Sequence, residues 1–354
     1  MSNQVSVIGV AVLLTTSIAA AAGLPTFEVD PSWPKVPAKW KLGDASSVAI
    51  DGKDNIWVLH RPRTLLKPED AAKAAPPVIV FDTNGNYVKA WGGAGKGYEW
   101  PEREHGIHID SKGFVWLGGN SCPTNGLPGL KPVADDQLLK FTEDGQFVMQ
   151  IGHSNLSKGN GDTANLHRPA DVWVYPPTNE LFVADGYGNH RIAVFDAGRG
   201  TFKRMWGAFG NKPMDDDHCQ VVTPTSFLDP GPQQFSIVHA IRVANDGTVY
   251  VADREYRRVQ MFTKGGKFLK QLVRTGEPFA RDLAFSPDQQ FLYVGGGKSI
   301  FIVSPKTLEI VGNIEPTGII GGGHQIATDS KGNLYIAQTS AGLQKLVFKG
   351  MSQK

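Results

Sequence analysis

One stretch of the chain recurs along its length, and this recurrence restricts the possible fold more than any other feature. The stretch is HAIRVANDGTVYVADREYRRVQMF, residues 239–262. It alternates apolar and polar residues, and an Asn-Asp-Gly turn interrupts the alternation, which is typical of antiparallel hairpins. The stretch therefore predicts three short consecutive strands joined by a tight turn and a polar loop.

Six copies of this pattern follow one another, and each complete copy predicts four strands. Copies three to five run at about 40 residues apart from inserted loops, and four strands at that period are typical of a β-propeller. The segments 67–77 and 207–234 are expected to be loops inserted into the blades rather than linkers between domains. The copies begin at Ser46, His105, Ala170, His239, Arg281 and His324.

The sixth copy lacks a clear fourth strand, whereas the extended segment from Thr26 to Trp33 belongs to no copy. We expect this N-terminal strand to complete the last blade and close the ring, because an open ring would leave sheet edges unpaired. The chain is therefore predicted to be all-β, with residues 23–354 forming a single six-bladed propeller. A β-sandwich or a solenoid is the alternative, but the even copies and the absence of helical periodicity favour the propeller.

The first 22 residues differ from the rest of the chain. Residues 5–22 are apolar and end in alanines before Gly23, as in a secretory signal peptide. No Lys or Arg precedes this run, and an uncleaved anchor is the alternative. We expect residues 1–22 to be a signal peptide, and the protein to be periplasmic or secreted without stable membrane association after cleavage. Export would allow a disulfide between Cys122 and Cys219, and two free thiols are the alternative.

The composition of the whole chain is that of an ordinary soluble globular protein, with 41% hydrophobic and 20% charged residues. The net charge is only +2, which gives no sign of binding to nucleic acid. We therefore expect no nucleic-acid partner, and we expect a monomer.

Three of the nine histidines occupy the same place in the repeat. His105, His239 and His324 each begin the first strand of their copy, and each precedes a turn glycine by eight residues. The first strand of a blade lines the central channel, and copies two, four and six are about 120° apart in a six-bladed ring. Three imidazoles would therefore meet on the axis at one level.

This arrangement predicts a metal site. Three histidine ligands with a free fourth position are the ligand set of a catalytic zinc, although imidazole also suits copper, iron and nickel. The alternative is that each histidine is a polar channel residue hydrogen-bonded to backbone or water. The shared register on alternate blades favours the metal site.

Charged and aromatic residues are predicted on the same rim. The loop after the second strand lies near the start of the first strand, and it carries Arg61, Tyr187 and Arg254 in copies one, three and four. An arginine pair can bind a carboxylate through forked hydrogen bonds, and a tyrosine beside a metal ion and two cations can act as a base. The alternatives are rim salt bridges for the arginines and simple packing for Tyr187. Asp185 and Asp253, at the ends of second strands, are interpreted as structural caps.

The order of these motifs resembles a known family. The segments VADGYGNHRIAVF and VADREYRRVQMF are similar to NHL repeats. The series HRPR, EHGIHID, ADGYGNHRI, FSIVHAI, ADRE and GHQI resembles the lyase domain of peptidylglycine α-amidating enzymes over residues 40–348. The resemblance implies a six-bladed propeller with a zinc ion, which cleaves peptidyl-α-hydroxyglycine to a peptide amide and glyoxylate. It implies His105, His239 and His324 as metal ligands, Tyr187 as the catalytic residue, and Arg61 and Arg254 as substrate-binding residues.

The resemblance also implies a structural calcium ion, bound by two backbone carbonyls and an aspartate. Val48 and Ile107 match the carbonyl positions, but Gln325 stands where the aspartate is expected. A neutral amide binds a hard cation more weakly than a carboxylate does. Gly188 stands where the family has a disulfide cysteine.

On these grounds we expect a Zn²⁺-dependent lyase, with Ca²⁺ as a second cofactor implied by the resemblance. Its substrate is expected to be a peptide or a small molecule with a terminal carboxylate. Two other functions fit a propeller: a lactonase-like hydrolase or lyase, whose metal ion is usually held by carboxylates, and a non-catalytic NHL binding module. The fold alone does not choose among them.

Overall fold

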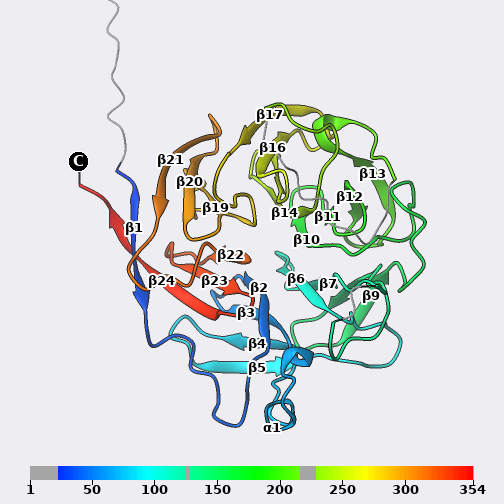
Figure 1. Ribbon diagram of the computed structural model, residues 1–354, viewed down its shortest axis with the longest axis vertical. Helices are drawn as coiled ribbons and strands as arrows, with labels where there is room; N and C mark the ends of the chain where they lie inside the picture. The colour runs from blue at the N-terminus through cyan, green and yellow to red at the C-terminus, as the bar shows by residue number, and fades with distance from the viewer. Residues whose placement is uncertain (1–22, 125–126, 216–228, 354) are drawn as a thin grey trace, which may run out of the picture.

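The computed structural model describes residues 23–124, 127–215 and 229–353, and nearly all of their regular structure is β-strand. Six sheets of four antiparallel strands stand in a ring (Figure 1). This confirms the predicted six-bladed β-propeller.

In the first five blades the strands follow chain order from the channel outwards. Blade 1 contains β2 (Asp44–Ile50), β3 (Ile56–Arg61), β4 (Val78–Phe81) and β5 (Tyr87–Trp91), and blade 2 contains β6 (Glu104–Ile109), β7 (Val115–Gly119), β8 (Leu138–Phe141) and β9 (Phe147–Ile151). Blade 3 contains β10 (Asp171–Tyr175), β11 (Glu180–Asp185), β12 (Arg191–Asp196) and β13 (Phe202–Trp206). Blade 4 contains β14 (Val238–Val243), β15 (Val249–Asp253), β16 (Arg258–Phe262) and β17 (Phe268–Val273), and blade 5 contains β18 (Leu283–Phe285), β19 (Leu292–Gly295), β20 (Ile300–Ser304) and β21 (Glu309–Ile314).

The sixth blade joins the two ends of the chain. It contains β22 (Gln325–Thr328), β23 (Leu334–Gln338), β24 (Gly342–Met351) and, as its outer strand, β1 (Pro25–Asp30). Antiparallel pairing of β1 with β24 brings Phe27 opposite Phe348 and Val29 opposite Leu346. The N-terminal strand thus closes the ring as predicted, and it covers the edge that β24 would otherwise present.

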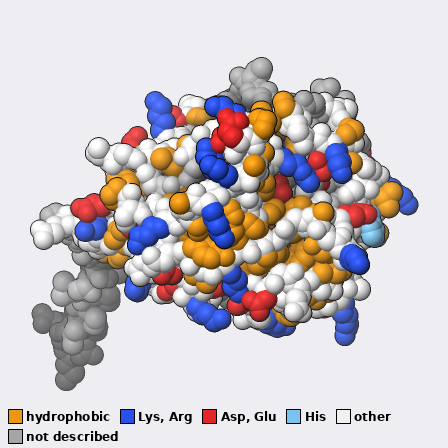
Figure 2. All heavy atoms as spheres, turned by 90° about the horizontal axis from the view of Figure 1, so that it is seen from below, with side chains coloured by type: hydrophobic (Ala, Val, Ile, Leu, Met, Phe, Trp, Pro, Cys, Tyr) orange, Lys and Arg blue, Asp and Glu red, His pale blue; other side chains and the backbone are white. Residues whose placement is uncertain are grey.

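Hydrophobic cores between neighbouring blades hold the ring together. Strand β3 is buried along its whole length, whereas the outer strand β5 is partly exposed. Trp57, Trp116 and Tyr335 are fully buried between blades. On the face shown in Figure 2, basic and acidic side chains lie among one another, in keeping with the small net charge.

Turns between the first two strands of blades 1, 2 and 6 share one hydrogen-bond pattern. Asp51 accepts hydrogen bonds from two backbone N–H groups of its turn at 2.8 and 2.9 Å, and from the indole of Trp57 at 2.9 Å. The same pattern recurs at Asp110 with the indole of Trp116, and at Asp329 with the hydroxyl of Tyr335 in place of an indole. Bonds from an aspartate side chain to nearby backbone favour turns, so these residues fix the short connections at one end of the channel.

Each first strand has an extra residue near its start. In blades 1, 2 and 4 the pairing register of the first strand shifts there. In blades 3, 5 and 6 the backbone N–H of the extra residue donates to a carbonyl of the second strand. The residue that carries this carbonyl also pairs with the residue that follows the extra one. Such β-bulges re-aim side chains and are common beside functional sites. The residues at the bulge position are Ser46, His105, Ala170, His239, Arg281 and His324.

The long connections between strands contain the short helices. These are η1 (Pro62–Thr64), α1 (Pro68–Ala71) and η2 (Ala208–Gly210), and no helix in the described part of the chain is long and apolar enough to span a membrane. The predicted signal peptide, residues 1–22, lies outside the described residues, as does Cys219. Cys122 is buried and disulfide-bonded, which rules out the free thiol at that position.

Candidate metal centre

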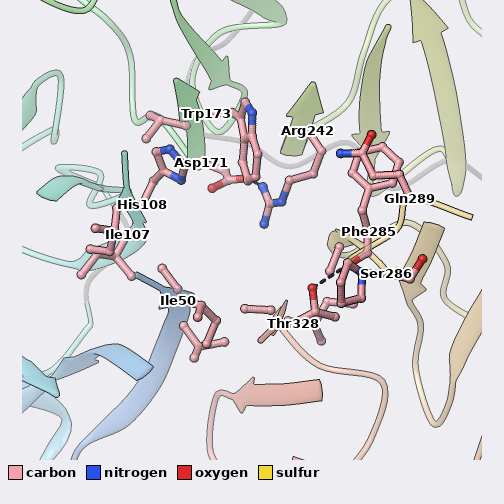
Figure 3. Close-up of a pocket in the computed structure, with 18 residues that line it drawn as sticks. Ile50, Ile107, His108, Asp171, Trp173, Arg242, Phe285, Ser286, Gln289 and Thr328 are labelled. Carbon is pink, nitrogen blue, oxygen red and sulfur yellow. Dashed lines mark hydrogen bonds and ion pairs between the residues drawn. The ribbon is translucent and has the colours of Figure 1, made fainter. Parts of the chain in front are cut away.

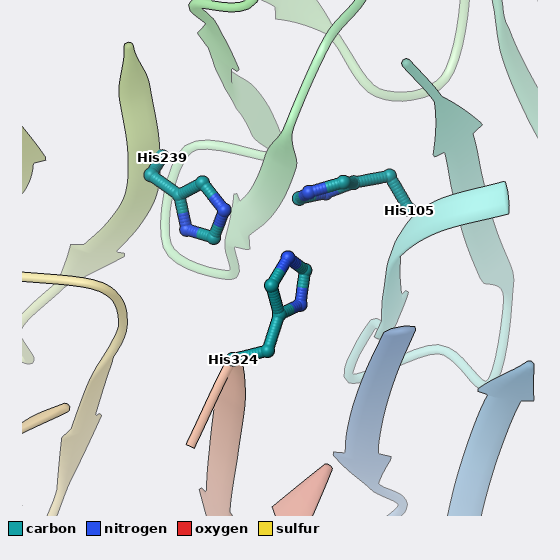
Figure 4. A group of neighbouring side chains, drawn as sticks. All are labelled: His105, His239 and His324. Carbon is teal, nitrogen blue, oxygen red and sulfur yellow. The ribbon is translucent and has the colours of Figure 1, made fainter. Parts of the chain in front are cut away.

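Three imidazoles meet in the central channel (Figure 4). They belong to His105 in β6, His239 in β14 and His324, which directly precedes β22. Their ring centroids are 4.7 to 4.9 Å apart, and their candidate ligand atoms lie within 4.8 Å of one another. Among the described residues, this is the one group of three His, Cys, Asp or Glu side chains placed to hold a metal ion.

Each imidazole is fixed by a backbone carbonyl of the next blade. Nδ1 of His105 and Nδ1 of His324 each lie 2.7 Å from the acceptor oxygen, and Nδ1 of His239 makes the equivalent contact. Because a carbonyl only accepts, Nδ1 carries the proton and Nε2 keeps the lone pair that a metal ligand needs. The acceptors belong to the residues at the bulge position of the other three blades, Ala170, Ser46 and Arg281.

Burial keeps these imidazoles neutral. It lowers the pKa of His324 to about 3, and it holds the pKa values of His105 and His239 well below the usual range. Positive charge adds to this effect, from Arg61 on His324 and from Arg254 on His239. The neutral imidazole is the metal-binding form, so the three residues fit an ion held by three nitrogen ligands.

Tyr187 lies beside the histidines, in the loop that follows β11. Its hydroxyl is 3.0 Å from Nε2 of His105 and 3.2 Å from Nε2 of His239. Arg254 donates a hydrogen bond to the same oxygen at 2.8 Å. One phenol oxygen therefore contacts two candidate metal ligands and a cation.

A second arginine packs against Tyr187, and sequence reasoning missed it. The guanidinium of Arg168 lies 5.6 Å from the phenol ring centroid, and that of Arg254 lies 5.3 Å from it. Arg168 also donates to the backbone carbonyls of Tyr187 at 2.9 Å and of Asn120 at 3.1 Å. It therefore ties the tyrosine loop to blade 2. It stands in the connection between blades 2 and 3, where the repeat pattern offers no signal for it.

The two arginines predicted from the sequence differ in their partners. Nε of Arg254 donates to the Glu255 carboxylate at 2.8 Å, and its second terminal nitrogen lies 2.7 Å from the same oxygen. Arg61 is buried, and its Nε donates to the backbone carbonyl of Glu104 at 2.7 Å. Burial, with Arg103 nearby, lowers the pKa of Arg61 to about 10. Of the two predicted arginines, Arg254 is thus the one that contacts Tyr187.

A cavity of about 360 Å³ opens beside the histidines. His324, Arg254 and Arg281 contribute to its wall, together with Pro278 and Phe279. Arg281 stands at the bulge position of blade 5, where blades 2, 4 and 6 carry histidine. This shared register is the sequence signal that could have identified Arg281 as a site residue.

The aspartates at the ends of second strands close loops, in agreement with their structural interpretation. Asp185 accepts the N–H of His167 at 2.8 Å and pairs with Arg191 at 2.8 Å. Asp253 makes the equivalent contacts with a backbone N–H and with Arg258, each at 2.8 Å. Both carboxylates are fully buried.

The residues at the implied calcium position are engaged in hydrogen bonds with one another. Oε1 of Gln325 accepts a hydrogen bond from the Ser47 hydroxyl, and the Ser47 oxygen in turn accepts the N–H of Ile107 at 3.1 Å. Nε2 of Gln325 is buried without a partner, and an amide N–H cannot ligate a cation. The set Val48, Ile107 and Gln325 contains no carboxylate, so it offers calcium a weaker ligand set than one with an aspartate.

Comparisons with known proteins support the resemblance. The chain is 28% identical over 289 residues to peptidyl-glycine alpha-amidating monooxygenase B of Xenopus laevis, which covers 77% of this chain and 29% of the relative. It is 29% identical over 273 residues to a probable peptidyl-alpha-hydroxyglycine alpha-amidating lyase of Caenorhabditis elegans, which covers 69% and 71%. It is 23% identical over 344 residues to NHL repeat-containing protein 3 of Mus musculus, which covers 90% and 82%. No protein-family model matches the chain.

The homologues of this chain thus include amidating monooxygenases, a probable lyase and an NHL repeat protein, as the motifs indicated. The chain spans 24–29% of the length of the amidating monooxygenases that it matches. Together with the six-bladed ring, these relatives support a lyase-like propeller at the level of the family.

Proposed function

We propose that the protein is a zinc-dependent lyase that cleaves the C–N bond of peptidyl-α-hydroxyglycine, or of a similar carbinolamide, to an amide and glyoxylate. The observation that carries the proposal is the contact of the Tyr187 hydroxyl with His105, His239 and Arg254. A relative whose name states a probable amidating lyase supports it over 69% of the chain.

The three neutral imidazoles would hold the ion, and nitrogen ligands of this kind suit zinc. Bound zinc would supply Lewis-acid polarisation of a substrate oxygen. The remaining steps belong to side chains of the chain itself.

Tyr187 is placed to move one proton. We propose that Tyr187 acts as the phenolate, that its oxygen accepts the proton of the substrate hydroxyl, and that the electron pair of the broken O–H bond forms the aldehyde C=O. The C–N bond breaks with its electron pair on nitrogen, and the phenol returns the proton to that nitrogen. The products are the amide and glyoxylate, and no water is consumed. The Arg254 hydrogen bond stabilises negative charge on the phenol oxygen, and Arg61 adds positive charge beside His324, which favours a substrate with a carboxylate.

We also propose that the protein is exported and acts as a monomer. The apolar N-terminal run and the disulfide at Cys122 support export, because disulfides persist in oxidising compartments. N-terminal sequencing of protein recovered from a secreting host tests this proposal, which fails if residues 1–22 are retained. Light scattering coupled to size exclusion tests the monomer.

The decisive experiment measures glyoxylate release from a short α-hydroxyglycyl peptide by the zinc-loaded protein, with and without a chelator. Release above the spontaneous rate that the chelator abolishes and zinc restores is the expected result. A protein that holds one zinc ion per chain but releases no glyoxylate would overturn the proposed reaction. Profiling of lactones would then test the lactonase-like alternative, and absence of turnover would leave the non-catalytic binding module.

A further inference from the structure

Arg281 occupies a position in blade 5 that three other blades give to histidine. It lies at the bulge position directly before β18, and its backbone carbonyl accepts the hydrogen bond from Nδ1 of His239. Its main chain is therefore part of the support for one candidate metal ligand. Its side chain lines the cavity beside His324, next to Arg254.

The guanidinium of Arg281 differs from its neighbours because the described residues give it no partner. Within residues 23–124, 127–215 and 229–353, no acceptor lies within hydrogen-bond or ion-pair distance of this side chain. Glu255 contributes only a longer-range attraction, while Arg254 repels it. A half-buried cation beside a second cation, without a counter-ion, is costly unless a ligand supplies the negative charge.

Arg254, in contrast, is already engaged on both sides. It is ion-paired with Glu255 at 2.7 Å and donates to the Tyr187 hydroxyl at 2.8 Å. A substrate carboxylate would have to displace one of these partners in order to form a forked pair with Arg254. Arg281 can form such a pair without losing any bond.

We infer that Arg281 is the residue that binds the substrate carboxylate in the cavity beside His324, and that Arg254 is a positioning residue for Tyr187. This inference rests on the proposed lyase function, because it assigns the anionic end of that substrate. A guanidinium can hold a carboxylate by two parallel N–H···O bonds. Pro278 and Phe279 add apolar surface to a wall that is otherwise mostly charged or polar, with Glu255 already paired to Arg254.

Binding can be tested without turnover, by calorimetry with a matched pair of probes. Glycolate carries a carboxylate beside a hydroxyl, and glycolamide is its neutral counterpart. We expect the zinc-loaded protein to bind glycolate more tightly than glycolamide, and Arg281→Met to reduce that preference roughly 10- to 100-fold. Because glycolate could also contact zinc, the titration is repeated on metal-free protein, in which a preference that depends on Arg281 should persist.

The variants separate the roles of the two arginines. Arg281→Lys keeps the charge but not the fork, and should retain part of the glycolate preference, whereas Arg254→Met should keep most of it. Arg199→Met, which removes an exposed charge from a turn of blade 3, is the control and should behave as wild type. Circular dichroism confirms that each variant is folded.

Kinetics give the second readout once turnover is established. Arg281→Met should mainly raise KM for the carboxylate substrate, and Arg254→Met should mainly lower kcat. Equal glycolate preference in wild type and Arg281→Met, with loss of preference in Arg254→Met, would overturn the inference. An Arg281-dependent glycolate preference in a protein that releases no glyoxylate would instead refute the lyase proposal and keep the carboxylate site.

Discussion

The two ends of the central channel are built from the same six first strands but carry different chemistry. The metal end, at the starts of these strands, holds His105, His239 and His324, and the long inserted connections border it. The turn end, at the ends of the same strands, holds a cavity of about 240 Å³ (Figure 3), and aspartate-capped turns border it. Each blade contributes to this second cavity, through Ile50, Ile107, Trp173, Arg242, Phe285 and Thr328.

Each end also contains an arginine from a first strand or its start, and the two arginines differ in their ion-pair partners. Arg242 at the turn end is buried, is ion-paired with Asp171 and with Asp282 at 3.3 Å, and lies 5.3 Å from the ring of Trp173. Arg281 at the metal end has no such partner among the described residues. A paired buried charge is part of the scaffold, whereas an unpaired charge beside candidate ligands is open to substrate. In this ring, the starts of the first strands therefore carry the candidate binding groups, whereas the ends of the same strands carry a charge that belongs to the scaffold.

The largest effect is expected from removing one histidine at the metal end. His239→Ala should abolish both zinc binding and glyoxylate release, because two imidazoles do not complete the ligand set. The matched change at the turn end is His108→Gln, since His108 lies on the same strand as His105 and its Nε2 accepts the N–H of Val174 at 3.2 Å. Metal analysis and the glyoxylate assay compare the two. If His239→Ala kept its zinc and its activity, the distinction between the two ends would be wrong.

Tyr187→Phe should sharpen the comparison by separating metal binding from proton transfer. The change removes the hydroxyl that contacts His105 and His239 but leaves all three imidazoles. We expect zinc content to stay at the wild-type level and kcat to fall by about 10²- to 10⁴-fold, the usual contribution of a general base. Steady-state kinetics with metal analysis check this. An unchanged kcat would remove Tyr187 from the mechanism.

Arg242→Met should damage stability at the turn end instead. It leaves Asp171 and Asp282 buried without their cation, which typically costs about 3–5 kcal/mol. Urea unfolding of the metal-free protein at pH 8, above the raised pKa of Asp282, measures the loss. The double variant Arg242→Met/Asp282→Asn should recover part of it, because one of the two orphaned charges is then gone. A stability loss below about 1 kcal/mol would contradict a structural role for this ion-pair cluster.

The smallest expected effect is a pH dependence of stability that arises at Asp282, a partner of Arg242. Burial, together with the nearby Asp171, raises the pKa of Asp282. The folded protein therefore keeps this proton at pH values where the unfolded chain, with its ordinary pKa near 3.8, has lost it. The stabilisation is fully present below the unfolded pKa and is lost as the pH rises through the folded pKa. The slope should be at most about 1.4 kcal/mol per pH unit.

Asp282→Asn should remove this part of the pH dependence. Burial also raises the pKa values of Glu104, Asp135 and Asp253, and these groups act in the same direction. The measurement is therefore the difference between wild type and variant in urea unfolding from pH 4 to pH 8. Parallel curves over that range would show that Asp282 does not contribute.

Much of the fold and of the metal site could be predicted from local patterns. The alternating strands and turn residues repeat often enough to indicate six blades, and the unassigned segment from Thr26 to Trp33 indicated the strand that the structure places at Pro25–Asp30. The convergence of the histidines could be predicted because, in a closed ring, residues at the same position of each repeat lie at the same level around one axis. Arg281 shares that position, so the same argument brings it to the site.

Other parts of the site depend on contacts between blades. Arg168 reaches Tyr187 from a connection without repeat character, and Arg254 is engaged by its own neighbour, Glu255. The implied calcium position is occupied by a hydrogen bond between Ser47 of blade 1 and Gln325 of blade 6. Pairs that are far apart in sequence leave no local pattern, because each side chain alone is compatible with several partners.

The sequence by itself determined the periodicity of this protein, and with it the number of blades, the closing strand and the convergence of three histidines. These properties follow from short-range alternation and from a constant interval, which are visible residue by residue. Only the tertiary structure decided which ring nitrogen faces the axis, because the carbonyl that holds each Nδ1 comes from the next blade. It also decided that Arg242 is ion-paired, whereas Arg281 has no partner among the described residues. An ion pair forms only where the folded ring brings two opposite charges within a few ångströms of each other.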